Sequence, residues 1–308
     1  MTDADKSADS SRNRFTDAAT VGSYKLGALA AKLMPGPLAS VTATSLGFGA
    51  SFTSPAKRAM IERHLQRVNP NLRGASLRVA AQQAFDSYAK YYVESFRLPS
   101  LSKKTVARSM SVESFHHVTD ALKQGNGCIF ALPHLGGWEW AGRWMTDQGF
   151  PMTVVVEALE PPELFKWFAD LRKELGMTVI PTGQGAGAAV MAALKRNEIV
   201  CLLSDRDIDR SGVEVEFFGE RTTLPAGPAT LGIRLGTPVL PVGCYFTPQY
   251  NGHHAIVRPP LSLARRGGLR DDVKRITQNL AHELEFLIRR APEQWHMFQP
   301  NWPSDPGY

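Results

Sequence analysis

The sequence predicts an α/β fold: a mainly parallel central sheet covered by helices on both faces, with a helical extension at the N-terminus. The first observation behind this prediction is that strand-like apolar runs alternate with helical segments from residue 127 onward. Such alternation is typical of parallel sheets that are buried on both faces. The second is that residues 55–98 space their apolar side chains as a helix does and contain no strand-like run.

The predicted elements follow one another without an internal repeat. Ser54 stands before Pro55, which is typical of a helix start, and the aromatic stripe at Tyr88, Tyr92 and Phe96 is typical of a helix packed against a core. Further helices are predicted at 111–127, 138–149, 161–176, 187–197, 227–236 and 269–292. Strands are predicted at 128–133, 151–159, 177–183, 198–205, 238–246 and 253–263.

No linker divides the chain, so one domain is predicted for residues 21–308, behind a disordered polar tail at residues 1–20. Three parts are expected within this domain. They are an apolar membrane-associating helical segment, a helical part and an α/β core, at residues 21–53, 54–126 and 127–303.

The apolar segment 21–53 is the candidate for contact with a membrane. Lys25, Lys32 and the "PGP" at 35–37 interrupt it. A transmembrane helix needs about 20 continuous apolar residues, so a membrane span is not expected. The segment is predicted to form two short helices that pack on the body of the protein or lie in a membrane interface.

Composition excludes some classes of function. The 308 residues are 43% hydrophobic and 21% charged, as in globular proteins. The net charge of +6 favours anionic partners, but the basic residues are scattered and show no nucleic-acid-binding signature, so nucleic acid is not an expected partner. Cys128, Cys201 and Cys244 lie far apart in apolar runs, which predicts reduced thiols and a cytosolic environment.

A histidine and a glutamate lie together in "ALPHLGGWEWAG", residues 131–142. His134 follows the first strand of the core, at the strand end where such sheets bind ligands. Gly136 and Gly137 allow a tight turn and leave room for a substrate. Glu139 falls in the next helical turn, and a carboxylate bonded to one ring nitrogen raises the basicity of the other. The pattern predicts general-base catalysis, with an ordinary structural His–Glu pair as the alternative.

Charged residues follow a second core strand. Asp205, Arg206 and Asp207 come directly after the apolar run "IVCLLS". Because the carboxyl ends of parallel strands meet at one edge of a sheet, these side chains are expected to converge on His134. The alternative is a solvated loop with its own salt bridges, in which Arg206 pairs with Asp207 instead of holding an anionic head group. Metal binding is not expected, since no third ligand is in register with His134 and Glu139.

Three motifs together resemble a known family. "PHLGGWE" resembles the H-x-x-x-x-[D/E] motif of glycerolipid and lipid A-type acyltransferases, and "PEQWHMFQPNW" their C-terminal tryptophan block. The stretch "SDRDIDRSGVEVEFFGERTTLPAGPATLGIRLGTPVLPV" resembles their second block. Order and spacing match over roughly residues 55–303, and the details are most similar to the actinobacterial phosphatidylinositol mannoside acyltransferases. Those enzymes transfer a long acyl chain from acyl-CoA to a mannose hydroxyl at the cytoplasmic face of the plasma membrane.

The resemblance assigns catalytic roles by position. It makes His134 the base and Glu139 its motif partner. Asp205 falls at an acidic position where relatives carry glutamate, and its shorter side chain leaves open whether it meets His134 directly or through water. Backbone amides near Gly136 and Gly137, or a basic side chain, are the expected donors to the oxyanion that forms during transfer.

The resemblance also assigns residues to substrate binding. Glu157 and Arg172 fall where the family lines its site, although taken alone they would be interpreted as surface residues. Arg206 is the further polar candidate. Phe217 and Phe218, with the tryptophans of the first motif, are expected to pack in the core or to line the acyl groove.

What the resemblance implies is a peripheral-membrane O-acyltransferase at the cytoplasmic face of the plasma membrane. Its partners would be acyl-CoA as donor, a glycolipid acceptor and an anionic membrane surface. Because the acceptor supplies the nucleophile, no covalent acyl-enzyme, metal or cofactor is expected, and the lack of a G-x-S-x-G motif agrees with this. The alternatives are an acyltransferase for a lysophospholipid or a lipid A-like sugar, using acyl-CoA or acyl-carrier protein, and a non-catalytic lipid-binding protein.

Overall fold

The computed structural model describes residues 22, 24–157 and 161–308. The predicted polar tail, residues 1–20, lies outside the described residues. Residues 24–33 are helical, and after a break at Met34 and Pro35 a second helix, α2 (Gly36–Thr53), begins. The two helices predicted for segment 21–53 are thus present over its described part. Within the described ranges, no helix combines the length and the apolarity that crossing a membrane would require.

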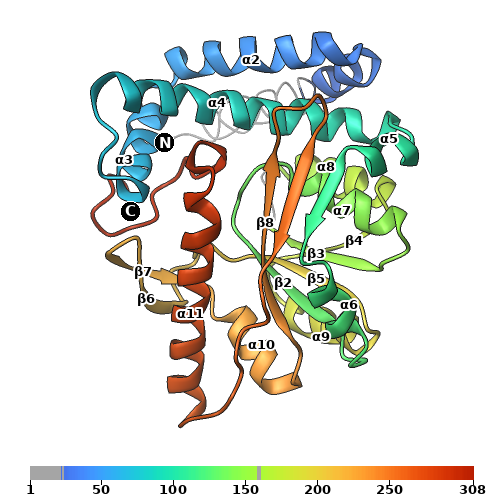
Figure 1. The fold of residues 1–308 in the computed structure, drawn as a ribbon, viewed down its shortest axis with the longest axis vertical. Helices are drawn as coiled ribbons and strands as arrows, with labels where there is room; N and C mark the ends of the chain where they lie inside the picture. The colour runs from blue at the N-terminus through green and yellow to red at the C-terminus, as the bar shows by residue number, and fades with distance from the viewer. Residues whose placement is uncertain (1–21, 23, 158–160) are drawn as a thin grey trace, which may run out of the picture.

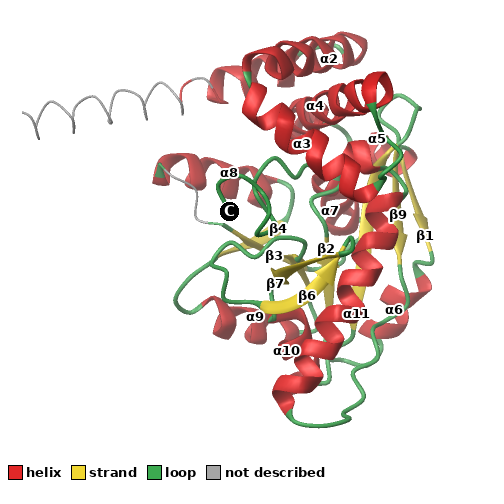
Figure 2. Cartoon of the chain, turned by 90° about the vertical axis from the view of Figure 1, so that its left-hand side faces the viewer, coloured by secondary structure: helices red, strands yellow, loops and turns green. Residues whose placement is uncertain are grey.

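A helical layer lies beyond the upper end of the sheet in Figures 1 and 2. It consists of α2, α3 (Pro55–Val68) and α4 (Gly74–Arg97). Helix α3 begins at Pro55 as predicted, but the Ser54 side chain makes no capping bond. Of the predicted aromatic stripe on α4, Phe96 is buried and Tyr88 and Tyr92 are half-buried. The short elements η1 (Leu98–Ser100) and α5 (Lys103–Arg108) then lead to the sheet.

The central sheet has seven strands in the order β1-β9-β8-β2-β5-β3-β4. Neighbouring strands are parallel except β8 and β9, which form an antiparallel pair. The predicted α/β fold with a mainly parallel sheet is therefore confirmed. The strands are β1 (Met110–Glu113), β2 (Cys128–Leu132), β3 (Met152–Val156), β4 (Met177–Pro181), β5 (Ile199–Leu203), β8 (Val239–Phe246) and β9 (His253–Val257).

Helices cover both faces of this sheet, as its apolar strands require. All of β2 is buried, with Ile129 and Ala131 on one face and Cys128, Phe130 and Leu132 on the other. The first face packs against α9 (Ala186–Lys195), α10 (Gly227–Leu235) and the long α11 (Leu269–Arg289), drawn in red in Figure 1. The second packs against α5, α6 (His116–Leu122) and α7 (Trp138–Asp147), and α8 (Pro162–Glu174) contacts β4 at the edge.

Three strands were not predicted. Strand β1 has only four residues, alternately half-buried and exposed, so it shows no apolar run. Strands β6 (Val213–Phe217) and β7 (Glu220–Leu224) form a separate antiparallel hairpin. Its turn residues Phe218 and Gly219 both have positive φ, 51° and 76°, as a type I′ turn requires. Phenylalanine is not a usual residue there, so the residues of this turn did not indicate a hairpin.

Candidate active site

His134 and Asp205 come together at the carboxyl ends of two adjacent strands. Leu132, the last residue of β2, pairs in register with Leu203, the last residue of β5, and each site residue follows two positions later. Nδ1 of His134 lies 2.7 Å from Oδ1 of Asp205, and the backbone N–H of His134 donates to Oδ2 at 2.9 Å. The contact left open by the sequence is therefore direct.

Asp205 is a fully buried carboxylate that stays ionised. Burial alone raises its pKa, but the facing imidazole of His134 and the hydrogen bonds from His134 and Trp295 outweigh burial and hold the pKa below its ordinary value. The indole N–H of Trp295 donates to Oδ2 at 2.7 Å. Since the carboxylate accepts from Nδ1, the neutral imidazole keeps its proton there and leaves Nε2 as the basic nitrogen.

The C-terminal segment contacts the chain around His134 through backbone hydrogen bonds. Leu135 and Trp295 form an isolated β-bridge, and the backbone N–H of His296 donates to the carbonyl of His134 at 2.8 Å. The backbone N–H of Gly136 donates to the carbonyl of Gln294 at 3.0 Å. The Gly136 amide is therefore committed to this contact, and the prediction that it serves as an oxyanion donor is not supported.

The two glycines of the first motif have a packing role. Gly136 has φ of 59°, so the tight turn is confirmed. A Cβ on Gly136 would lie 2.4 Å from the carbonyl oxygen of Cys244 in β8, and one on Gly137 would lie 2.6 Å from the ring of His253. The expectation that these glycines make room for a substrate is wrong, because protein atoms fill that space.

Glu139 does not bind His134, and this corrects the predicted pairing. It lies in the first turn of α7 as predicted, but its Oε1 accepts from Nη2 of Arg172 at 2.5 Å and from the hydroxyl of Tyr91 at 3.2 Å. Burial alone lowers the pKa of Arg172, but the Glu139 charge outweighs burial and raises it. Burial and the same charge raise the pKa of Tyr91 well above its ordinary value, so its hydroxyl remains a donor.

Arg172 is thus a buried partner of Glu139 and not the surface residue that its sequence context suggested. The pair joins α7 to α8, with only 14% and 6% of the two side chains exposed. The Arg172 guanidinium also lies 5.9 Å from the ring centroid of Phe168. Glu139 therefore organises the wall beside the histidine, which is a different role from orienting the imidazole.

Glu139→Gln should lower the free energy of unfolding by about 3–5 kcal/mol, because it leaves the Arg172 charge buried without its carboxylate. Chemical denaturation at neutral pH measures this. The double variant Glu139→Gln/Arg172→Met should recover part of the loss, since neither charge remains. Asp170→Asn, which breaks the exposed Lys166–Asp170 pair on α8, is the control and should leave stability nearly unchanged. A fall no larger than that of the control would contradict the structural role.

A cleft of about 610 Å³ opens beside His134. Glu157 at the end of β3 and Arg206 after β5 both line it, and their side chains face each other at 3.9 Å between Oε2 and Nη1. Asp207 lines it too, but its carboxylate accepts from the backbone N–H of Gly212 at 2.8 Å. The alternative of an Arg206–Asp207 salt bridge is wrong for the residues that the structure describes. Arg206 and Glu157 lie where a polar substrate would contact them.

A second, apolar cavity adjoins the cleft. It lies between the sheet and helices α6 and α7, and includes Phe130, Val154, Leu203 and Val242 among its walls. Trp138, Val155, Val156, Leu203 and Arg172 line both spaces, so they form the boundary between the cavity and the cleft that contains His134. The free volume of the cavity is about 80 Å³.

Phe217 and Phe218 do not line the cleft or the cavity. Phe217 is 0% exposed and stacks on Trp302 at 5.6 Å between ring centroids, and Phe218 packs against Trp295 at 5.8 Å. Their prediction as walls of an acyl groove is wrong, and the core-packing alternative holds. Of the tryptophans in the first motif, Trp138 lines both spaces, while Trp140 is buried against His253.

His296 is a site residue that the sequence did not indicate. It lines the cleft, is 4% exposed, and its Nε2 lies 2.9 Å from the hydroxyl of Ser87, while its buried Nδ1 has no partner among the described residues. Burial first, and then the facing His134, lower its pKa to about 3, so it stays neutral. Its position inside the tryptophan block was the only available signal.

The site thus combines a histidine–aspartate pair, a cleft lined by both charged and apolar residues, and an apolar cavity. A base with one ring nitrogen tied to a carboxylate can take a proton from a hydroxyl, and the cavity can hold an acyl chain beside it. These features suit the transfer of an acyl group to a hydroxyl. The alternative of a non-catalytic lipid-binding protein gives no role to the histidine–aspartate pair.

Comparison with known proteins supports this class. Residues 11–304 match the model of the bacterial lipid A biosynthesis acyltransferases, and the chain belongs to this family. It is 40% identical over 222 residues to a phosphatidylinositol mannoside acyltransferase of Mycolicibacterium smegmatis, covering 71% of each chain. It is 37% identical over 227 residues to that of Mycobacterium tuberculosis, covering 72% of this chain and 70% of the relative. The predicted resemblance and the assignment as an acyltransferase are confirmed.

Proposed function

We propose that this enzyme transfers a long acyl chain from acyl-CoA to a mannose hydroxyl of phosphatidylinositol mannoside, with His134 as general base. The observation that carries the proposal is the 2.7 Å contact between Nδ1 of His134 and Asp205, which leaves Nε2 for the substrate. The mycobacterial relatives, at 37–40% identity, are named for this acceptor. A sugar head group suits the charged part of the cleft, where Glu157 can accept from hydroxyls and Arg206 can bind a phosphate.

The reaction follows from the position of the base. As the acceptor oxygen bonds to the thioester carbonyl carbon, Nε2 of His134 takes the hydroxyl proton, and Asp205 stabilises the imidazolium that forms. The tetrahedral intermediate then collapses, the carbon–sulfur bond breaks, and the thiolate of coenzyme A leaves and takes up the proton. The acyl chain lies in the apolar cavity during this step. Each buried methylene contributes about 0.8 kcal/mol to its binding.

An acceptor panel tests the proposal. Radiolabelled palmitoyl-CoA would be incubated with the enzyme and phosphatidylinositol mannoside, a lysophospholipid or a lipid A-like sugar, and the products separated. Labelled phosphatidylinositol mannoside is the expected main product, and octanoyl-CoA should be a much poorer donor. Preferential labelling of either other acceptor, or activity only with acyl-carrier protein as the donor, would contradict it.

The same proposal places the enzyme on the cytoplasmic face of the plasma membrane, as a peripheral protein. Support comes from the apolar side chains that 24–53 leaves exposed: Leu26, Leu29, Leu33, Leu38, Val41, Leu46, Phe48 and Phe52. Lys25 and Lys32 are exposed on the same segment. Free thiols at Cys128, Cys201 and Cys244 suit a reducing compartment.

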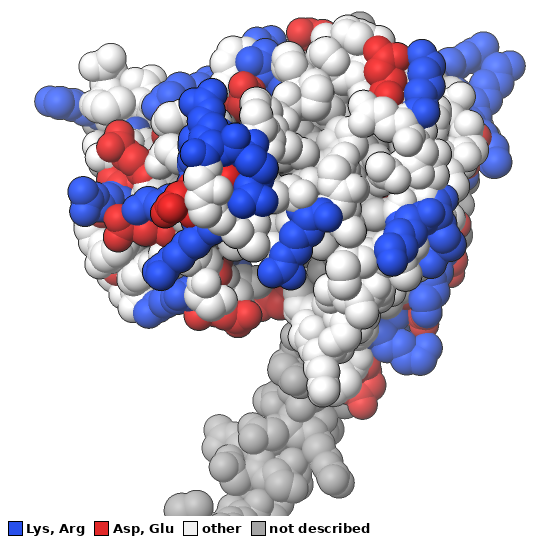
Figure 3. Space-filling model, turned by 90° about the horizontal axis from the view of Figure 1, so that it is seen from below, with Lys and Arg blue, Asp and Glu red and all other residues white. Residues whose placement is uncertain are grey.

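Elsewhere the surface charge is mixed. On the face seen in Figure 3, Lys and Arg side chains stand in separate groups, with Asp and Glu among them and uncharged residues between. Such a surface differs from the continuous basic tract that binding to nucleic acid by charge alone would use. The segment 24–53, with its apolar residues, is the better candidate for contact with anionic lipid.

The enzyme should bind anionic vesicles reversibly and less tightly at high salt, because charge interactions at the surface are screened within about 10 Å at 0.1 M salt. Sedimentation with vesicles at low and high salt measures this. The double variant Leu33→Glu/Phe52→Glu should bind much less, whereas Met191→Glu, an exposed position on α9, should bind as the wild type does. Attachment that resists both salt and carbonate extraction would indicate an integral membrane protein instead.

A further inference from the structure

The C-terminal segment 294–305 holds both members of the His134–Asp205 pair. The indole of Trp295 donates to the Asp205 carboxylate, and the backbone N–H of His296 donates to the His134 carbonyl. In addition, Nδ2 of Asn301 donates to the backbone carbonyl of Asp205 at 2.9 Å. The orientation of the catalytic pair therefore depends on how firmly this segment is fixed.

One buried carboxylate fixes the turn that carries Asn301. Oδ2 of Asp305 accepts the backbone N–H of Asn301 at 2.9 Å and that of Trp302 at 3.1 Å. The Asp305 side chain is 0% exposed. Asn301 and Trp302 are buried as well, and Trp302 donates from its indole to the carbonyl of Phe217 at 3.0 Å. Asp305 is thus the common acceptor for the amides of this turn.

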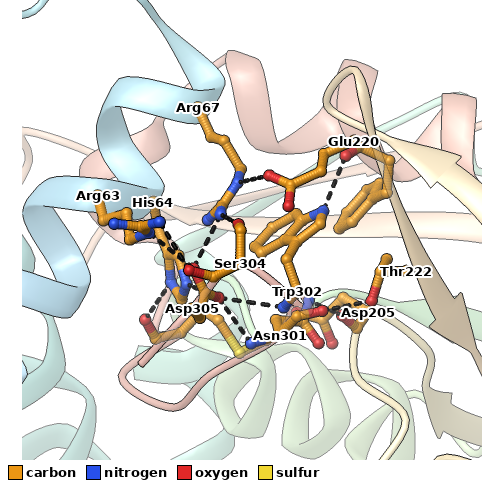
Figure 4. Close-up of polar contacts among 12 residues, drawn as sticks. Arg63, His64, Arg67, Asp205, Glu220, Thr222, Asn301, Trp302, Ser304 and Asp305 are labelled. Carbon is orange, nitrogen blue, oxygen red and sulfur yellow. Dashed lines mark hydrogen bonds and ion pairs between the residues drawn. The ribbon is translucent and has the colours of Figure 1, made fainter. Parts of the chain in front are cut away.

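The same carboxylate ties the turn to α3, as Figure 4 shows. Nε of Arg63 donates to Oδ1 at 3.1 Å, and Nη2 of Arg67 forms an ion pair with Oδ1 at 2.8 Å. Nε2 of His64 lies 3.1 Å from Oδ2. Nδ1 of His64 lies 3.0 Å from the carbonyl oxygen of Met297, so this ring contacts the segment at two points. Three residues on one face of α3 therefore anchor the segment that carries Asn301.

The charge of Asp305 is needed for this arrangement. Burial alone raises its pKa, but the hydrogen bonds from His64 and Asn301 and the charges of the neighbouring bases outweigh burial and hold the pKa below its ordinary value. Besides the contact with the His64 ring, Oδ1 accepts from Arg63 and Oδ2 from the backbone N–H groups of Asn301 and Trp302. A carboxamide would turn one of these acceptors into a donor and set it against Arg63 and Arg67.

We propose that Asp305 is a positioning residue for acyl transfer: by tying the 301–305 turn to α3, it keeps Asn301 on Asp205 and so keeps the Asp205 carboxylate on Nδ1 of His134. This inference rests on the function proposed above. The simpler alternative is that Asp305 stabilises the fold without affecting the site. The two roles predict different values of kcat for an Asp305 variant that remains folded: kcat falls if Asp305 positions the site and is unchanged if it only stabilises the fold.

Asp305→Asn tests the proposal, with Asp272→Asn as the matched control. Asp272 is also buried and accepts from two arginines, Arg265 and Arg275, and from backbone amides, but it lies at the start of α11 without a link to the site. Both variants should melt at lower temperature. Assayed where both are folded, Asp305→Asn should lower kcat by roughly 10- to 100-fold, because small misplacements of a catalytic group are costly. Asp272→Asn should leave kcat unchanged.

Two further measurements distinguish a positioning role of Asp305 from a purely stabilising one. The KM for acyl-CoA should stay within about twofold of the wild type for Asp305→Asn, since the C-terminal segment packs on the α11 side of the sheet and the apolar cavity lies on the α7 side. Asn301→Ala should lower kcat similarly, and combining it with Asp305→Asn should add little, because both act through one contact. Should Asp305→Asn not fold, Arg63→Gln, whose side chain is 46% exposed, replaces it with a smaller expected loss of kcat.

Proton NMR tests the positioning role of Asp305 without any substrate. The downfield resonance of the His134 Nδ1–H, bonded to Asp205, should weaken or shift in Asp305→Asn and remain in Asp272→Asn. A folded Asp305→Asn with wild-type kcat and resonance would overturn the inference, as would an equal loss of kcat in Asp272→Asn. If the wild type labels none of the acceptors offered, the proposed function fails while this resonance still tests the role of Asp305.

Discussion

His134→Ala should lower the rate of acyl transfer by about 10²–10⁴-fold, the usual cost of removing a general base. The protein should stay folded, because 29% of this side chain is exposed and its backbone contacts to Asp205 and His296 do not need the imidazole. Asp205 would still accept from Trp295 and from the amide at position 134. Initial rates with saturating palmitoyl-CoA and acceptor measure the loss of transfer, and a melting curve checks that the variant is folded.

The control for this prediction is His282→Ala, which removes an exposed histidine on α11. It should transfer acyl groups at the wild-type rate. The slow hydrolysis of acyl-CoA by water in the cleft should fall together with transfer in His134→Ala, since the same base would activate the water. A His134→Ala enzyme that kept more than about a tenth of the wild-type rate would contradict the assignment of the base.

The free energy of unfolding should fall by about 2 kcal/mol between pH 6.5 and 4.5 because of His296 alone. The pKa of this residue is lowered from 6.5 in ordinary surroundings to about 3 in the folded protein. Between those values the unfolded chain binds a proton that the folded protein does not, so the contribution is complete above pH 6.5 and is lost as the pH falls. The slope is about half of 1.4 kcal/mol per pH unit at pH 6.5 and approaches about 1.4 kcal/mol per unit near pH 5.

Urea denaturation at a series of pH values measures this loss. His296→Gln keeps a hydrogen-bonding side chain beside Ser87 but cannot titrate, so its stability should fall less steeply over the same range. Asp205 and Asp305, whose pKa values are also lowered, lose their contributions only as the pH falls through the carboxyl range, below this window. Equal slopes for the wild type and His296→Gln would show that His296 is not held neutral.

The sheet and the position of the catalytic pair were predictable from the sequence for one physical reason. Parallel strands buried on both faces must be almost wholly apolar, and their carboxyl ends share one edge. Charged residues directly after two such strands, His134 and Asp205, therefore had to lie on the same edge. That β2 and β5 are direct neighbours, which makes the contact 2.7 Å, depends on strand order and could not be deduced.

The partner of Glu139 was wrongly predicted because sequence spacing does not fix the direction of a side chain at a helix start. Glu139 is in the expected helical turn, but it binds Arg172 of α8 and Tyr91 of α4 instead of His134. Both partners are distant in sequence. Without a structure, a carboxylate five residues from a histidine looked like its orienting group.

Phe217 and Phe218 show a second limit. The "FFG" sequence forms the end of a hairpin whose turn needs positive φ at Phe218, and that conformation holds both rings in the core. The contacts of the C-terminal segment could not be predicted from the sequence either, because Trp295 and Asn301 lie far from Asp205 along the chain. The sequence located this segment as a block of tryptophans but contained no sign of what it holds.

Initial-rate kinetics with both substrates varied test the central claim most directly, namely that the acceptor hydroxyl attacks acyl-CoA with His134 as base and without an acyl-enzyme. Donor and acceptor must then occupy the site together, so double-reciprocal plots at different acceptor concentrations should intersect. Mass spectrometry of the enzyme quenched with acyl-CoA alone should find unmodified protein. Parallel plots, as in ping-pong kinetics, together with a trapped acyl-protein would contradict the account.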